Sequence, residues 1–530
     1  MSSDKKQTFM KGALILMIAN IVVKVIGAAF KIPLTYILGE EGMALFSTSY
    51  NVYTWLFIVA TAGIPVAISR MISETRAKGN FAEVDRIRKV SFSLLSVIGI
   101  AGTLILFFGA EFFARLLDNP DAALGIRAIS PAILFVSFMS AYRGYFQGHQ
   151  NMMPTAISEV SEALGKLVIG FLCAYLLFEK GVIYSSAGAV FGVAMGGLLG
   201  FITLFIAFVT KKEKGQKSLG FVHSRGTILK KLIVIAVPIT IGASVFSLTS
   251  LIDVAMIMRN LRASGFTYEE AKILYGSYTG YAVPLFNLPP TLISAITISL
   301  VPTISKALAE RDLVTAKATT SNSILITILF ALPCAVGMSV LSGPILDLVY
   351  NNTNAESTLA VLALAIVFVS LVMVTNAILQ SAGKERIPVI NMLIGGVVKI
   401  IINNYLVKNP DINILGAPIG TIACYVVILV LNMISLIKVI GIKFSLMQYL
   451  IKPVISAALM GVTARFTYSF VSVLGGKIAL IAAIALAAIV YLALLMLMRA
   501  VSETLLLSIP GMSKLVPLFK KLRLIKSEDI

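Results

Sequence analysis

The sequence predicts an all-α polytopic membrane protein, one that crosses the bilayer many times as helices. Of its 530 residues, 58% are hydrophobic and only 13% are charged. A soluble globular protein carries about 25% charged residues, so this composition argues against a soluble enzyme, a nucleic-acid-binding domain and a disordered chain. The alternating ten-residue segments of a membrane β-barrel are absent, and open sheet edges cannot face lipid, so the spans are expected to be helices.

Fourteen apolar stretches are long enough to cross a membrane, which takes about 20 helical residues. Their limits are 12–37, 44–69, 90–113, 123–146, 155–178, 183–210, 229–257, 275–303, 314–341, 356–381, 387–407, 412–437, 453–474 and 478–499. Of the 44 Lys and Arg residues, 31 fall in segments on the side that holds both termini, and 8 in loops on the other side. Because cytoplasmic loops collect Lys and Arg, we expect a multi-pass protein of the cell (cytoplasmic) membrane with both termini in the cytoplasm.

The two halves of the chain resemble each other weakly. Gln147 precedes Lys166 by 19 residues, and Gln380 precedes Lys399 by the same 19. The polar residues that end span 2 recur at the end of span 8 with an offset of 236. A chance match between loop residues is the alternative. We interpret the pattern as a duplicated block of six helices; an even number gives both copies the same orientation, which makes a parallel repeat of the kind found in transporters.

This repeat predicts two pseudo-symmetric six-helix lobes plus two additional C-terminal helices. The expected parts are an N-terminal lobe at 1–210 (spans 1–6), a basic cytoplasmic linker at 211–228, a C-terminal lobe at 229–441 (spans 7–12), and spans 13–14 with a basic cytoplasmic tail at 442–530. Glycine and proline interrupt corresponding spans of the two lobes, where we expect hinges; ordinary kinks in a packed bundle are the alternative. The hinge candidates are Gly27, Gly63, Pro65, Pro284, Pro289 and Pro290.

Charged side chains inside the spans point most directly to function. A charge near the bilayer centre costs at least ~2.5 kcal/mol, so it normally faces a cavity or a partner. At 1.5 Å per helical residue, four cations lie roughly 17–20 Å from the predicted cytoplasmic edge of a core about 30 Å thick. These are Lys24, Lys166, Lys399 and Arg465. We expect them to meet in one hydrated cavity, and an excess of cations over acids there suits an anionic passenger such as a phosphate or pyrophosphate.

Polar stripes at helical spacing extend this candidate site along spans 1 and 11. The predicted substrate-binding residues are Lys24, Lys31, Lys166, Lys399, Arg465, Asn20, Asn391, Asn403 and Asn287. The candidates for ion coupling are the acids Glu159, Glu162 and Asp253. The three cysteines stand singly in apolar runs, which predicts neither a disulfide framework nor a metal site.

Several of these residues have a simpler interpretation. Glu162 and Lys166 are spaced for an ion pair within one helix, and Asp253 is near enough to the outer end to be solvated. Lys31 is able to extend its ammonium group to the interface, and Arg465 to pair with a lipid headgroup or a nearby carboxylate. Lys24 has no acid on its own span, and neither does Lys399, so the cavity is favoured for both.

The N-terminal residues resemble a known family. The run from Lys11 continues as Lys24-Val-Ile-Gly27, then Leu38-Gly39-Glu40-Glu41-Gly42, then Ala62-Gly-Ile-Pro-Val-Ala-Ile-Ser69-Arg70. It is similar to the stage V sporulation protein B family and the related lipid II flippases, within the multidrug/oligosaccharidyl-lipid/polysaccharide exporter (MOP) superfamily. The likeness covers the whole chain in span count, repeat and linker, and it is most specific in residues 8–79.

The resemblance implies a flippase, not an enzyme. It implies two lobes that open alternately inward and outward around a central cationic cavity, with Lys24 among the cavity cations, and a groove beside spans 13 and 14 for a polyprenyl tail. The implied passenger is an undecaprenyl-pyrophosphate-linked sugar, either lipid II or a related cell-wall or polysaccharide intermediate, which connects the protein with cell shape and sporulation. The expected partners are this substrate, membrane lipids and cell-wall synthesis enzymes, with no nucleic acid and the protein as a monomer.

No cofactor is expected, and no GxxxxGK[ST] loop is present for nucleotide binding. Coupling to the membrane potential, sodium or protons is expected instead. One alternative is a proton- or sodium-coupled exporter of cations or drugs with the same fold, for which the acids matter and the lysines do not. Another is a membrane enzyme acting on lipid-linked sugars, but the outer loops are short and neither His149 nor His223 is near a membrane acid. A scaffold without transport would need no mid-membrane cations.

Overall fold

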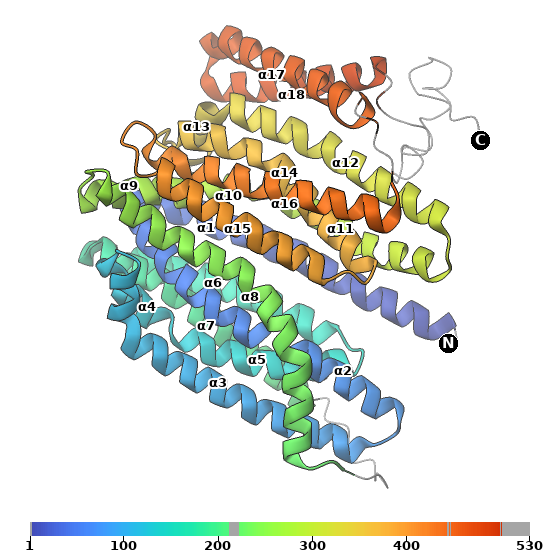
Figure 1. Ribbon diagram of the computed structural model, residues 1–530. Coiled ribbons are helices and arrows are strands. Elements are labelled where there is room, and N and C mark those ends of the chain that lie inside the picture. The colour runs from blue at the N-terminus through green and yellow to red at the C-terminus, as the bar shows by residue number, and fades with distance from the viewer. Residues whose placement is uncertain (1–2, 211–221, 443–444, 446, 499, 501–530) are drawn as a thin grey trace. The chain divides into compact units, whose positions relative to one another are not determined.

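The computed structural model describes residues 3–210, 222–442, 445, 447–498 and 500, and every regular element in these ranges is a helix (Figure 1). The all-α prediction is therefore confirmed. Most of the predicted linker (211–221) and most of the predicted basic tail (501–530) lie outside the described residues. By contact, the chain divides into two compact units, residues 1–280 and 281–530. The lobe boundaries expected from the repeat stay a prediction.

The first unit contains α1 to α9. Their bounds are α1 Ser3–Thr61, α2 Ile64–Ala77, α3 Phe81–Leu116, η1 Pro120–Ala122, α4 Ala123–Ile129, α5 Pro131–Gly148, α6 Met153–Leu176, η2 Phe178–Lys180, α7 Val182–Thr210, α8 Arg225–Ala263 and α9 Tyr268–Ser277. Within it α6 packs along α7, α5 lies between α3 and α7, and α8 packs on α2 and α3 (Figure 1). The α8 side of that contact is apolar and buried, formed by Ile228, Leu232 and Ala236.

The second unit holds the remaining helices. Their bounds are η3 Tyr278–Ala282, which begins in the first unit, then α10 Val283–Phe286, α11 Leu288–Ala309, α12 Leu313–Val340, α13 Ser342–Tyr350, α14 Glu356–Ser381, α15 Arg386–Leu406, η4 Asn413–Leu415, α16 Gly416–Ile440, η5 Met447–Ile451, α17 Lys452–Val471, η6 Ser472–Leu474 and α18 Gly476–Leu497. Here α17 and α18 form a hairpin against α12, and the Tyr491 hydroxyl donates to the Leu329 carbonyl at 2.9 Å. Spans 13 and 14 thus pack on span 9 of their own unit.

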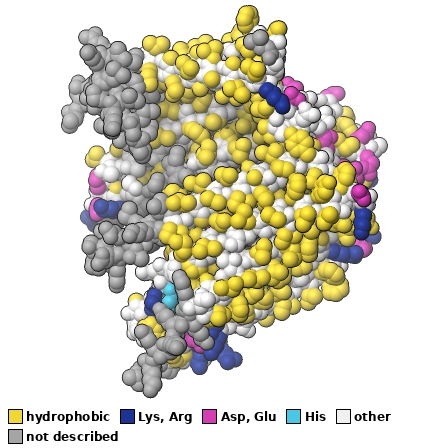
Figure 2. Space-filling view, turned by 180° about the vertical axis from the view of Figure 1, so that it is seen from behind, with side chains coloured by type: hydrophobic (Ala, Val, Ile, Leu, Met, Phe, Trp, Pro, Cys, Tyr) yellow, Lys and Arg dark blue, Asp and Glu magenta, His cyan; other side chains and the backbone are white. Residues whose placement is uncertain are grey.

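Ten helices of the described chain are long and apolar enough to cross a membrane. The first of them, Ile15–Ile58, contains a non-helical kink at Gly39 (φ 62°) and so corresponds to two predicted spans. The predicted spans at 155–178, 229–257 and 275–303 also fall on helix. Hydrophobic side chains cover the middle of the helices on the face in Figure 2, as expected for contact with lipid.

Of the predicted hinge positions, all except Gly27 lie at helix breaks. Gly63 precedes α2, and a Cβ on it would collide with the Ala236 carbonyl of α8, so only glycine allows this approach. Pro65, Pro284 and the pair Pro289-Pro290 occupy the first turns of α2, α10 and α11, where a missing N–H costs no helical hydrogen bond. Gly27 lies within α1 with open space around it. Hinge motion at these breaks stays a prediction.

A buried amide network holds α14, α15 and α16 together. The Asn391 amide donates to Asn432 Oδ1 at 2.8 Å, and the Asn432 amide donates to Thr375 Oγ1 at 2.9 Å and to Asn376 Oδ1 at 2.8 Å. Asn432 and Thr375 are fully buried. In a bilayer such polar contacts between helices replace the hydrophobic driving force that lipid does not provide.

We expect Asn432→Leu to lower the free energy of unfolding by about 1–2 kcal/mol, because the polar groups of Asn391, Asn376 and Thr375 lose their partner at similar side-chain volume. The measurement is thermal unfolding in detergent. Asn20→Leu is the control, because Asn20 is exposed and its amide bonds, among the described residues, to the Leu16 carbonyl of its own helix alone. Equal losses in the two variants would contradict the importance of the network.

Candidate functional site

The structure brings two predicted cations together from different helices. Lys31 of α1 and Lys166 of α6 are both partly buried, and their ammonium groups are close enough to repel each other. Lys166 Nζ lies 4.5 Å from the ring centre of Tyr50 and 5.3 Å from that of Phe30, both on α1. Aromatic faces attract cations, so these rings hold the ammonium group without neutralising it. In the described chain neither lysine has a carboxylate within 4.0 Å, so no described acid neutralises the pair.

Glu162 pairs with an arginine that sequence reasoning left out of the site. Arg143 of α5 contacts the Glu162 carboxylate at 2.9 Å and donates to the Ser158 hydroxyl at 3.2 Å. The Arg143 side chain is only 14% exposed. The ion pair between Glu162 and Lys166 within one helix, which the spacing allowed, does not form. Arg143 falls inside the predicted limits of span 4, and a basic residue there was the available signal.

Glu159 lies one turn before Glu162 on α6. Its Oε2 atom is buried, and no hydrogen-bond partner for it occurs among the residues that the structure describes. Arg143 and Glu162 are its electrostatic neighbours. The site therefore combines an unneutralised lysine pair, a satisfied ion pair and a carboxylate with an unused oxygen.

A stripe of glycines on α7 sets the position of these α6 side chains. Gly192, Gly196 and Gly200 recur every fourth residue and face α6. A Cβ on Gly196 would lie 2.5 Å from the Glu162 carbonyl oxygen and 2.9 Å from the backbone nitrogen of Lys166. Small residues at such spacing let two membrane helices approach backbone to backbone. The charged groups of α6 are thus placed by direct contact between two backbones.

The other predicted residues of the first unit are arranged differently. Lys24 is exposed on α1, one turn from Asn20, and has no ion pair with any described residue. Asp253 is partly buried on α8 and interacts electrostatically with Tyr275. Neither residue lies in the cluster around Lys166.

In the second unit the predicted residues divide into two groups. Lys399 is partly buried on α15, while Arg465 on α17 and Asn287 between α10 and α11 are exposed. Asn391 and Asn403 are buried against α16, the first in the amide network and the second against Gly420. Their amides therefore serve helix packing in this arrangement. The meeting of Lys399 and Arg465 with the lysines of the first unit stays a prediction.

Comparisons with known proteins agree with this fold. Residues 9–308 match the family described as polysaccharide biosynthesis protein, and residues 277–405 match the MatE family. Stage V sporulation protein B of Bacillus subtilis (strain 168) is 25% identical over 96% of this chain and 99% of that protein. Lipid II flippase MurJ of the same organism is 27% identical over 86% of this chain and 88% of that protein.

A solved structure of lipid II flippase MurJ in an inward closed conformation superposes with a TM-score of 0.68 at 15% identity, covering 91% of this chain and 98% of the other. At that identity the likeness shows a common fold. The resemblance expected from the sequence is confirmed, since one family match covers more than half of the chain and the relatives extend over nearly all of it. This chain belongs to the polysaccharide biosynthesis protein family.

Proposed function

We propose that this protein is a flippase that moves an undecaprenyl-pyrophosphate-linked sugar from the inner to the outer leaflet by alternating access. The single observation that carries the proposal is the lysine pair of α1 and α6. Lys31 and Lys166 repel each other inside the membrane and have no carboxylate within 4.0 Å among the described residues. Two like charges are costly there unless a ligand of opposite charge visits them.

A pyrophosphate fits this requirement. Lysine ammonium groups bind phosphate oxygens as point charges, and two adjacent lysines match two adjacent phosphates. The aromatic rings of Phe30 and Tyr50 keep Lys166 in place without competing for the ligand's negative charge. Relatives named as lipid II flippases support the choice of a lipid-linked sugar over a free phosphate. We further propose that Lys24, Lys399 and Arg465 complete the site as the lobes move.

Transport then follows the electrical gradient. If both termini are cytoplasmic and the cell interior is negative, outward movement of each negative charge is favoured by roughly 2.3 kcal/mol per 100 mV. Glu159, whose Oε2 atom is buried without a described partner, is our candidate site for binding the proton or sodium ion that shifts the balance between the inward-open and outward-open states. The neighbouring Arg143–Glu162 pair already neutralises its own charges, so it is less suited to that task.

We expect Lys31→Gln and Lys166→Gln each to reduce headgroup translocation about tenfold, because each removes a charge-assisted contact with the pyrophosphate. The measurement is movement of an undecaprenyl-pyrophosphate-linked sugar across vesicles that contain the purified protein. Lys24→Ala and Lys399→Ala test the rest of the predicted cavity. Lys180→Gln is the matched control, because Lys180 is exposed in η2 between two spans. Equal rates in all variants would refute the cationic site.

A drug or cation exporter of the same fold is the second candidate, and the match of residues 277–405 to the MatE family favours it. This candidate requires a membrane acid, for which Glu159 is best placed. Efflux of a cationic dye that is lost in Glu159→Gln and kept in Lys166→Gln, without sugar translocation by the unmodified protein, would replace the flippase proposal.

A further inference from the structure

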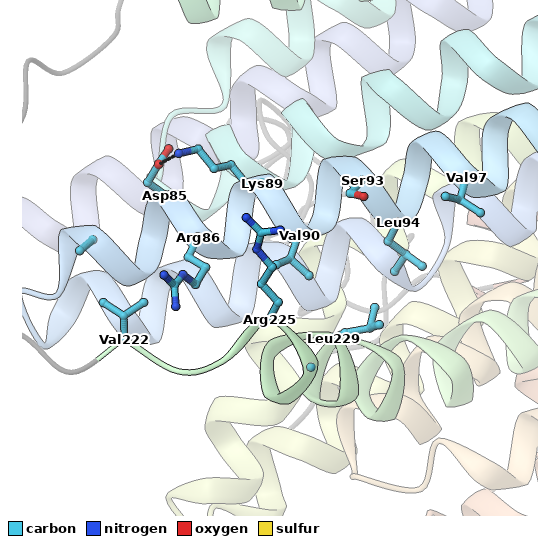
Figure 3. A pocket seen from close by; sticks show the side chains of 12 residues that line it. Asp85, Arg86, Lys89, Val90, Ser93, Leu94, Val97, Val222, Arg225 and Leu229 are labelled. Atoms are coloured by element: carbon cyan, nitrogen blue, oxygen red, sulfur yellow. Dashed lines mark ion pairs between the residues drawn. The ribbon is translucent and has the colours of Figure 1, made fainter.

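An open groove separates the start of α3 from the start of α8, and nothing in the proposed transport cycle uses it (Figure 3). Its volume is about 630 Å³. One wall is a single face of α3, with residues spaced by three or four from Ala82 to Val97, and the other runs from Val222 to Leu229. Both walls belong to the first unit. The groove is therefore a feature of one compact body.

One end of the groove is basic. Arg86, Lys89 and Arg225 line it, and Asp85 is the one acid among the lining residues. Asp85 is already neutralised, since it pairs with Arg88 at 2.6 Å and with Lys89 at 2.8 Å. Neither Arg86 nor Arg225 has a carboxylate within 4.0 Å in the described chain. Two arginine charges thus remain available to an anion.

The other end is apolar, with Val90, Leu94, Val97 and Leu229 along it. On α3 charged residues end at Lys89, and none follows until Glu111. On α8 they end at Lys231, and none follows until Asp253. Such a change from basic to apolar marks the boundary between water and hydrocarbon. The groove crosses this boundary, so a fitting occupant carries an anionic group at one end and a hydrocarbon chain at the other.

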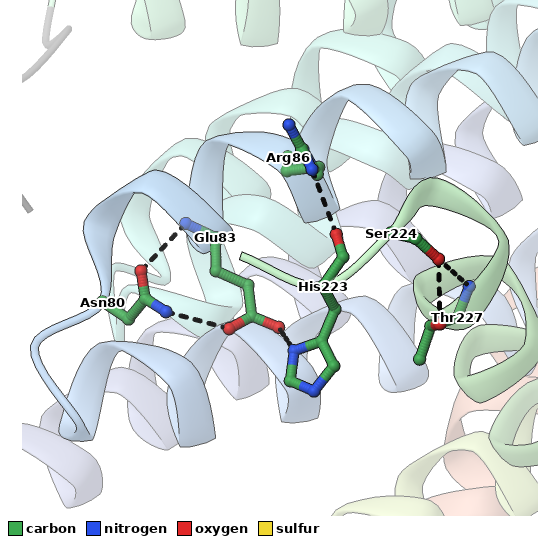
Figure 4. Close-up of polar contacts among 6 residues, drawn as sticks. All are labelled: Asn80, Glu83, Arg86, His223, Ser224 and Thr227. Carbon is green, nitrogen blue, oxygen red and sulfur yellow. Dashed lines mark hydrogen bonds and ion pairs between the residues drawn. The ribbon is translucent and has the colours of Figure 1, made fainter. Parts of the chain in front are cut away.

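A set of hydrogen bonds holds the second wall in place (Figure 4). The buried Glu83 carboxylate contacts His223 Nδ1 at 2.6 Å and accepts from the Asn80 amide at 3.0 Å. Arg86 donates to the His223 carbonyl at 3.2 Å. The backbone just before α8 is thereby fixed against α3, which brings Arg225 to the same groove as Arg86. The basic end is a preformed feature of the fold.

We propose that this groove binds a phospholipid whose headgroup is anionic. Its phosphate lies between Arg86 and Arg225, and one acyl chain follows Val90, Leu94 and Val97 into the membrane. Arginine suits this role because its planar guanidinium group donates two parallel hydrogen bonds to a phosphate. A free phosphate would leave the apolar wall without an occupant, so the length of that wall favours a lipid.

Native mass spectrometry of the full chain in detergent tests the proposal. Dioleoylphosphatidylglycerol and dioleoylphosphatidylcholine, which differ in headgroup charge and share acyl chains, are titrated separately. We expect phosphatidylglycerol to bind tighter, and Arg225→Gln to weaken its binding about fivefold, since one basic residue near the surface contributes about 1 kcal/mol. Arg86→Gln together with Arg225→Gln is expected to weaken it more than tenfold.

Arg115→Gln is the matched control. Arg115 lies near the opposite end of α3, is exposed, and makes no ion pair with a described residue, so the charge change is the same. Equal weakening by Arg115→Gln and Arg225→Gln would show general surface attraction and overturn the proposal. Full competition by millimolar inorganic phosphate would also overturn it in favour of a phosphate site. Thermal unfolding of each variant shows that a loss of binding is not a loss of folding.

Discussion

Replacing Gly196 with alanine is expected to lower the free energy of unfolding by about 2–3 kcal/mol, because overpacking against a backbone cannot be relieved by a rotamer change. The added Cβ would lie 2.5 Å from the Glu162 carbonyl oxygen and 2.9 Å from the backbone nitrogen of Lys166. The helices must separate, and Lys166 then moves away from Tyr50. Sugar translocation is expected to fall together with the thermal unfolding midpoint in detergent.

The next residue provides a matched control. A Cβ on Gly197 would have the Cβ of Phe135 as its nearest neighbour, at an ordinary contact distance of 3.4 Å. Gly197→Ala is therefore expected to be neutral, or slightly stabilising through the higher helix propensity of alanine. If Gly196→Ala were as stable and active as Gly197→Ala, the backbone contact between α6 and α7 would not position the site.

Replacing Lys272 with methionine is expected to lower the free energy of unfolding by about 2–3 kcal/mol, because removing one partner of a buried ion cluster leaves the other charges unopposed. The Lys272 side chain is 1% exposed, and its ammonium group lies 2.7 Å from Glu41 of α1, 3.2 Å from Asp121 of η1 and 2.8 Å from Glu269 of α9. The three carboxylates are themselves partly exposed, so the effect is placed below that of a fully buried pair.

The effect of this substitution depends on pH in a defined direction. Burial lowers the pKa of Lys272, but hydrogen bonds with Glu269, Glu41 and Asp121 outweigh it and raise the pKa above the ordinary value of 10.5. Because the pKa is raised in the folded state, the charged lysine stabilises the fold in full at every pH below 10.5. This contribution to the free energy of unfolding is lost only as the pH rises through the folded-state pKa. Between pH 5 and pH 9 the contribution of the lysine itself is therefore constant.

In Lys272→Met the three remaining carboxylates repel one another as long as they are charged. The difference in free energy of unfolding between Lys272→Met and the unmodified protein is expected to shrink as the pH falls from about 7 to about 4. Thermal unfolding at the two pH values measures it, with Lys180→Met as a control that removes an exposed lysine without an ion pair to the described residues. A deficit that stays the same at both values would mean that lost packing, not charge, causes the effect.

Local patterns in the sequence were enough to locate the helices. The predicted spans fall on helix, and three helices begin with Pro65, Pro284 or Pro289 in the first turn, because hydropathy and proline geometry act within a few residues of the chain. The charges inside the spans were visible for the same reason. Sequence comparison of the N-terminal residues also found the family, since the short runs that carry the likeness are contiguous.

The partners of each charged side chain, by contrast, depend on how the helices pack. Spacing along α6 allowed Glu162 to pair with Lys166. Instead, the Glu162 carboxylate forms an ion pair with Arg143 of α5, and the Lys166 ammonium group lies over aromatic rings of α1. Lys272, which the sequence placed in an outer loop, is buried among three acids from separate elements. Such partners depend on how far each helix is rotated about its axis and how closely it approaches its neighbour. Contacts between residues far apart in the sequence, such as those of the α7 glycines with α6, set both the rotation and the distance. A local sequence pattern does not predict such contacts.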